Sequence, residues 1–167
     1  MAHVTDSIEI GSDLERVYAL VSKVDNWPLW SISLGTVKSV EGDGTPGTVV
    51  HQTYSLLGKG IDYVTTVQEN GPKAGGGFTW RAERSGGLPG RLSFDIDLHD
   101  RRPLVSGELE YELPGGALGK AADHLGAKAA MEHSLRHALQ TLREIAEEEW
   151  FAGLEIKEEE WPKPCDE

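Results

Sequence analysis

Tyrosine and glutamine side chains recur at alternate positions of segments whose pattern is that of β-strands. Gln52 and Tyr54 share one side of one segment, Tyr63 and Thr65 share one side of the next, and Tyr111 ends a later one. A buried tyrosine hydroxyl seeks a hydrogen-bond partner, and several aimed at one space could hold a phenolic or carbonyl group or move a proton on it. The alternative is that each is an ordinary core side chain with a backbone partner.

His51 precedes Gln52 and therefore faces the other side of the same segment, unless the register is shifted by one residue. A histidine turned inward would suit general acid–base chemistry near neutral pH, whereas a surface strand histidine has no such role. The candidate catalytic groups are Tyr54, Tyr63, Tyr111 and His51.

No metal or nucleotide cofactor is predicted. Asp95, Asp97 and His99 alternate on one segment and point the same way, as metal ligands would. They share that side with Glu108 and Glu110 of the next segment, however, and a solvated outer face explains all five. The sequence contains no HExxH, CxxC, P-loop or Rossmann glycine pattern.

The apolar pattern changes period along the chain. Residues 4–10 predict a strand, Ser12 to Glu15 form a capping-box pattern before a short helix, and residues 25–30 predict a second short helix. From residue 34 to residue 113, alternating apolar residues between glycine-rich turns predict a meander of six strands. The greasy side of these strands includes Trp80, Phe94 and Leu98, and Arg84 lies at the end of its strand, on the inner side.

A single long helix follows the turn at residues 114–116 and is predicted to last to about Trp150. A helix of that length needs a matching apolar surface, and the greasy side of the sheet is the large one available. Small residues line its first half, which we expect to roof a cavity, whereas leucines from Leu135 to Ala146 anchor its second half. The roof residues are predicted to be Leu118, Ala122, Leu125 and Ala129.

Four motifs and three leucines carry a family resemblance. The motifs are Ile-Glu-Ile at 8–10, Leu-Glu-Arg-Val-Tyr-Ala-Leu-Val at 14–21, Asp-Asn-Trp-Pro-Leu-Trp at 25–30 and Leu-Pro-Gly-Gly-Ala-Leu-Gly-Lys at 113–120, and the leucines are Leu135, Leu139 and Leu142. Residues 3–148 resemble the START-like, or SRPBCC, superfamily, in its branch of polyketide cyclases, dehydrases and lipid-transport proteins. The resemblance implies an α+β helix-grip fold, with a curved antiparallel sheet of about seven strands wrapped around a long C-terminal helix and two short helices after the first strand.

The same resemblance implies a pocket between sheet and helix for an apolar, aromatic or polyketide-like ligand. In aromatase/cyclases of this kind an interior arginine helps to polarise the ligand carbonyl, and Arg84 is the candidate here. Trp27, Trp30 and Ser31 fall where the short helices of the family frame the pocket mouth. The remaining ligand contacts are expected from Gln52, Thr65, Trp80 and Phe94 on the sheet and from the four roof residues of the helix.

Two functions of different classes fit these features. The first is an enzyme that folds its substrate in the pocket and promotes cyclisation or dehydration, with tyrosine hydroxyls and His51 for proton transfer. The second is a non-catalytic carrier or sensor of a lipid-like or aromatic ligand, since function lives in the site and not in the fold. A third possibility is partner binding through the acidic, Trp-containing tail.

Composition and charge exclude some kinds of partner and cellular location. The 167 residues carry a net charge of −12, which argues against a nucleic-acid partner. The first twenty residues lack a basic stretch followed by an apolar run, no stretch is long and apolar enough for a membrane span, and the single cysteine is Cys165. We therefore expect a cytoplasmic monomer or homodimer, with a domain over residues 1–150 and a tail over residues 151–167.

Overall fold

The computed structural model describes the backbone of residues 2–56, 58–112 and 120–159, and the side chains of the same residues except 120–125 and 149–159. Seven antiparallel strands form one sheet in the order β1-β7-β6-β5-β4-β3-β2. The strands are β1 (Ala2–Glu9), β2 (Thr36–Glu41), β3 (Val49–Leu56), β4 (Lys59–Pro72), β5 (Phe78–Gly86), β6 (Gly90–His99) and β7 (Arg102–Tyr111). The predicted seven-stranded antiparallel sheet is therefore confirmed.

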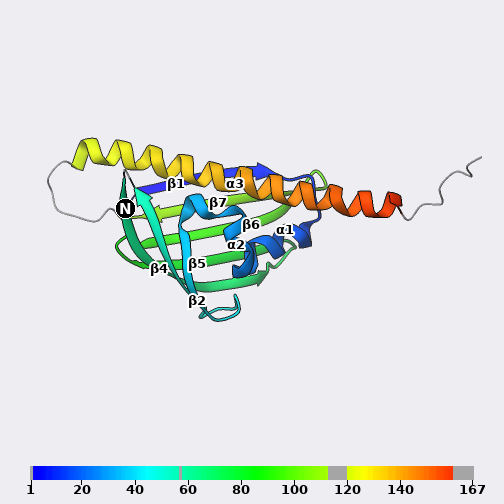
Figure 1. Ribbon diagram of the computed structural model, residues 1–167, viewed down its shortest axis with the longest axis horizontal. Coiled ribbons are helices and arrows are strands. Elements are labelled where there is room, and N and C mark those ends of the chain that lie inside the picture. The colour runs from blue at the N-terminus through cyan, green and yellow to red at the C-terminus, as the bar shows by residue number, and fades with distance from the viewer. Residues whose placement is uncertain (1, 57, 113–119, 160–167) are drawn as a thin grey trace, which may run out of the picture.

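The helices occupy one face of this sheet. Two short helices, α1 (Leu14–Ser22) and α2 (Trp27–Trp30), follow β1, and the long helix α3 (Lys120–Glu159) lies across the sheet and runs past it (Figure 1). Single 3₁₀ turns, η1 (Val24–Asn26) and η2 (Ile32–Leu34), flank α2. No helix in the part of the chain that the structure describes is long and apolar enough to cross a membrane. The antiparallel sheet with two short helices and the long α3 on one face is the helix-grip architecture expected from the sequence.

The start of α1 differs from the predicted capping box. Asp13 is the N-cap, and its side chain makes no capping bond. Ser12 lies one residue before the cap, and its buried hydroxyl has no partner among the described residues. Because the helix begins at Leu14, Glu15 is in its first turn, where a carboxylate is favoured by the helix dipole.

The core lies between the sheet and α3. On α3 the buried side chains recur with helical spacing and include Met131, Leu135, Leu139 and Leu142. Gly107 of β7 allows this contact, because a Cβ atom there would meet Leu135 Cδ1 at 2.9 Å. The leucine-rich half of the helix is thus seated directly on the sheet.

The structure differs from the prediction at the end of α3 and at the end of β6. The helix runs to Glu159, further than the predicted end near Trp150, and its backbone enters the segment expected to be a tail. Leu98, predicted on the greasy side of its strand, is 62% exposed because it pairs with Pro103 beside the β6–β7 hairpin, at the end of the sheet.

Candidate functional site

A row of residues crosses the inner face of the sheet from β4 to β7. The strand register places Thr65 beside Arg84, Arg84 beside Gly90, and Gly90 beside Tyr111. Gly90 has φ +156°, and a Cβ atom there would collide with the backbone of Glu110. The row therefore carries a guanidinium on β5 and a phenol on β7 with no side chain between them.

Arg84 is buried, with 5% of its surface exposed. Its guanidinium lies 4.6 Å from the centre of the Tyr63 ring, and one terminal nitrogen donates a long hydrogen bond of 3.4 Å to the carbonyl oxygen of Leu34. Its Nε has no partner, and no aspartate or glutamate is buried among the described residues. Burial of a cation without a carboxylate partner costs free energy. The site therefore favours a ligand oxygen that accepts a hydrogen bond from Arg84.

Two of the three candidate tyrosines are already bonded within the protein. Tyr63 donates to the carbonyl oxygen of Leu34 at 2.6 Å, and the Tyr54 hydroxyl shares a 2.7 Å hydrogen bond with the hydroxyl of Ser134 on α3. Burial raises the pKa of Tyr63, against the opposing effect of Arg84. Tyr63 is therefore a neutral hydrogen-bond donor near neutral pH and cannot serve as a base.

Tyr111 differs from the other two tyrosines. Its side chain is fully buried, and its hydroxyl has no hydrogen-bond partner among the described residues. Burial also raises the pKa of this phenol. The indole nitrogen of Trp80, likewise buried, has no hydrogen-bond partner in the described ranges. Buried donors normally find partners, so Arg84, Tyr111 and Trp80 are the groups with bonding capacity left for a ligand.

Gln52 and Thr65 satisfy each other. The Thr65 hydroxyl donates to the Gln52 side-chain oxygen at 2.6 Å, and the Gln52 amide donates to the carbonyl oxygen of Gly35 at 3.3 Å. This pair links β3, β4 and the turn before β2. Its geometry is that of a structural bridge.

The short helix α2 closes one side of the interior. The indole nitrogens of Trp27 and Trp30 donate to backbone carbonyls of α1, and the Ser31 hydroxyl donates to the carbonyl oxygen of Trp27 at 2.9 Å. Trp27 packs edge-on against Trp80 with ring centres 5.1 Å apart, and Trp30 packs in the same manner against Phe94 at 5.5 Å. These contacts fix the positions of the two indoles against the sheet in this conformation.

Seven of the predicted ligand-contact residues surround one small cavity. Its volume is about 10 Å³, which is room for one water molecule at most. Its lining residues are Val21, Trp27, Trp30, Ser31, Leu34, Gln52, Trp80, Arg84, Leu92 and Phe94. Ligand pockets usually measure ~300–1,000 Å³, so the aromatic side chains of this region must move for a ring-sized ligand to enter here.

A family model for "polyketide cyclase / dehydrase and lipid transport" matches residues 1–147. The chain belongs to this family. Family and fold together make the protein a START-like ligand-binding domain. A search of curated proteins gave no match.

Solved structures confirm the START-like fold. The Zhui aromatase/cyclase from a Streptomyces species is similar with a TM-score of 0.65 and 14% identity, over 87% of this chain and 93% of that one. A START superfamily protein from Mycobacterium smegmatis is similar with a TM-score of 0.62 and 18% identity, over 87% and 97%. At these identities the likeness concerns the fold alone.

Some predicted site residues of this polyketide cyclase/dehydrase family member lie elsewhere. His51 sits on the outer face of β3, beside Lys38 and Asp62, as its alternation with Gln52 predicts, so the register shift that would have turned it inward as a catalytic group does not occur. Ala129 is exposed on α3 and does not roof the interior. Leu118 lies outside the described residues, and the side chains of Ala122 and Leu125 are also outside them.

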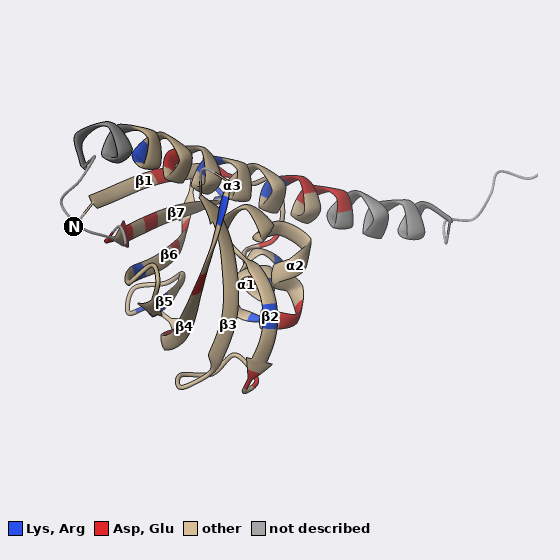
Figure 2. Ribbon diagram, turned by 60° about the vertical axis from the view of Figure 1, so that its left-hand side comes forward, with Lys and Arg blue, Asp and Glu red and all other residues tan. Residues whose placement is uncertain are grey.

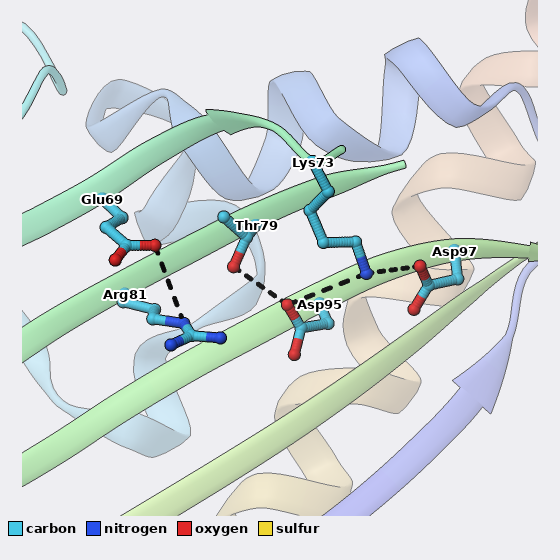
Figure 3. A network of polar contacts seen from close by, with 6 residues as sticks. All are labelled: Glu69, Lys73, Thr79, Arg81, Asp95 and Asp97. Carbon is cyan, nitrogen blue, oxygen red and sulfur yellow. Dashed lines mark hydrogen bonds and ion pairs between the residues drawn. The ribbon is translucent and has the colours of Figure 1, made fainter. Parts of the chain in front are cut away.

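The acidic side chains of β6 belong to the outer surface, as predicted. Lys73, which directly follows β4, reaches Asp97 and lies 3.9 Å from Asp95, which also accepts a 2.9 Å hydrogen bond from Thr79 (Figure 3). Sequence reasoning missed Lys73 because its segment has no strand alternation at that point. It also missed Ser134, because nothing in the helical pattern indicates that its hydroxyl forms a hydrogen bond with Tyr54.

Proposed function

We propose that this domain binds an apolar or aromatic, polyketide-like small molecule between the sheet and α3 and promotes its cyclisation or dehydration. The observation that carries the proposal is Arg84, a buried cation with no carboxylate partner among the described residues and with an unbonded Nε. Family membership and the aromatase/cyclase among the similar structures support the choice of ligand class.

The chemistry of the described interior is that of hydrogen-bond donors. A ligand carbonyl oxygen placed against Arg84 gains charge when a water molecule takes a proton from the adjacent carbon, and the guanidinium stabilises that developing enolate. Tyr111 offers a second donor across the side-chain gap at Gly90. In a dehydration, the same kind of donor would assist departure of a hydroxyl group as water.

A second function, a carrier or sensor that leaves its ligand unchanged, is favoured by one observation. The inner face of the described residues holds no buried carboxylate or imidazole, so it lacks an obvious base. Tyr54 and Tyr63 are also committed to bonds within the protein. The two functions share the pocket and differ only in what happens to the ligand.

Arg84→Gln, with Arg81→Gln as matched control, tests the binding site. Arg81 lies on the same strand, and its side chain is 55% exposed on the outer face. We expect Arg84→Gln to weaken binding of the anionic probe 1-anilinonaphthalene-8-sulfonate by at least ~10-fold, the loss of one charge-assisted bond. Binding of neutral N-phenyl-1-naphthylamine and both affinities of the control should stay unchanged. Unaltered binding of the anion by Arg84→Gln would contradict the site.

Mass spectrometry separates catalysis from carriage. Protein incubated with a linear poly-β-ketone thioester is expected to release a product lighter by one water per dehydration. We expect Tyr111→Phe to slow that conversion, because it removes a free donor. Recovery of the thioester unchanged from the intact protein would favour the carrier instead, and equal turnover in Tyr54→Phe, Tyr63→Phe and Tyr111→Phe would remove the tyrosines from the mechanism.

A further inference from the structure

A second constellation lies on the opposite, outer face of the sheet, where β1 pairs with β7. The register sets His3 directly across from Glu110, and Glu108 lies two residues away along β7. Val4 and Leu109, the intervening residues, are buried in the core. Alternation therefore turns His3, Glu108 and Glu110 outward together, at a place where acidic residues follow one another along β7 (Figure 2).

The three side chains converge at their tips. His3 Nε2 and Glu108 Oε1 are 2.7 Å apart, and one donor atom from each of the three residues lies within 4.8 Å of the other two. Within the described ranges no other set of three histidine, cysteine or acidic side chains meets this condition. Arg91 faces Glu110 from β6 and lines a groove together with it, but among the described residues it forms no ion pair within 4.0 Å, so the Glu110 carboxylate is not committed to a direct ion pair with it.

The donor types identify the class of ion. One imidazole nitrogen with two carboxylate oxygens suits zinc or manganese, whereas calcium and magnesium prefer oxygen alone and copper(I) prefers sulfur. Metal–donor bonds of ~2.0–2.2 Å bring donor atoms to roughly 3 Å from one another, a spacing that small side-chain rotations achieve here. A groove of about 370 Å³, which Glu108 and Glu110 help to line, leaves space for coordinating water.

We propose that His3, Glu108 and Glu110 bind a divalent transition-metal ion, zinc or manganese, on the outer face of the sheet. The ion would join β1 to β7, and β1 is an edge strand of the sheet. The site is independent of the interior ligand site, because alternation places the two on opposite faces of β7. Binding only to the folded chain would raise its melting temperature by on the order of 5 °C at a hundredfold excess over Kd.

Calorimetric titration of the full chain with zinc chloride tests the site. We expect one ion per chain, and weakening of at least ~10-fold in Glu108→Gln and in Glu110→Gln, since each removes one charged ligand. His3→Gln combined with Glu108→Gln should abolish binding. Manganese added to ¹⁵N-labelled protein should broaden the amide signals of β1 and β7 first, which a merely structural role of these residues would not produce.

His99→Gln is the matched control. His99 Nδ1 also meets a glutamate, Glu9, at 2.7 Å and lies 3.9 Å from Asp100, yet these three residues do not converge as the proposed ligands do. Its zinc affinity should equal that of the unaltered chain. Equal affinity in the His3/Glu108 double variant, manganese broadening centred elsewhere, or no heat of binding at millimolar zinc would each overturn the proposal.

Discussion

At the scale of single residues, the polar groups of the interior divide by whether the protein itself supplies their partners. Tyr54 and Tyr63 have partners, whereas Tyr111 and Arg84 Nε have none among the described residues. Alternation in the sequence predicted that these side chains share one face. It could not separate the two groups, because the partners come from the 3₁₀ turn η2 and from α3, distant elements whose approach depends on the whole fold.

Whether a tyrosine hydroxyl has a partner predicts how much stability its replacement by phenylalanine costs. Tyr63→Phe leaves the buried carbonyl oxygen of Leu34 without its short hydrogen bond and should lower the free energy of unfolding by ~1–3 kcal/mol. Tyr111→Phe removes a hydroxyl that has no hydrogen-bond partner in the described part of the chain, and it should change the free energy of unfolding by less than ~0.5 kcal/mol. Urea unfolding followed by tryptophan fluorescence measures both. Equal destabilisation by the two changes would show that Tyr111 has a partner in the folded protein.

At the scale of elements, the change of period from helix to strand and back predicted the order of helices and strands correctly. The face of α3 was harder to predict at Ala129, because alanine is small enough to occur on either side of a helix and so carries little directional information. The buried positions Ala127 and Met131 are four residues apart, and Ala129, halfway between them, therefore faces away. Larger residues such as Leu135 and Leu139 were placed correctly because burial of their side chains contributes far more free energy.

The contact between β7 and α3 depends on a missing side chain. In Gly107→Ala the new methyl group would meet Leu135 Cδ1 at 2.9 Å and Phe94 Cε1 at 3.1 Å. We expect a loss of ~1–3 kcal/mol in the free energy of unfolding, the usual cost of overpacking. Gly71→Ala on β4 is the control, because a Cβ atom there has no neighbour within 4 Å. Urea denaturation compares the two, and equal stability would mean that the helix shifts freely on the sheet.

At the scale of the whole molecule, the family match ends at residue 147 and the last buried side chain described on α3 is Ala146. The backbone of the helix nevertheless continues to Glu159. The sequence could predict the boundary of the packed domain from where the apolar stripe ends, but not the end of the helix, since the glutamates that follow are good helix formers. We propose that the folding unit ends near residue 150.

Truncation tests that boundary. A chain that ends at Trp150 should melt within ~2 °C of the full chain, since it keeps every described core residue. A chain that ends at Leu139 loses the buried Leu142 and Ala146 and should not fold cooperatively. Differential scanning calorimetry measures both. A large loss of stability in the longer truncation would place part of residues 151–167 within the folded domain.

The two edge strands of the sheet, β1 and β2, differ in how readily another chain could pair with them. Contact with α3 shields β1, whereas β2 ends the sheet on the other side and exposes Val40. Its register against β3 shifts between Val37 and Ser39, so that an irregularity falls at the charged Lys38. A strand that is bent and charged at its middle is a poor template for a flat added strand. The irregularity and the charge of β2 therefore disfavour growth of a fibril from the open edge of this sheet.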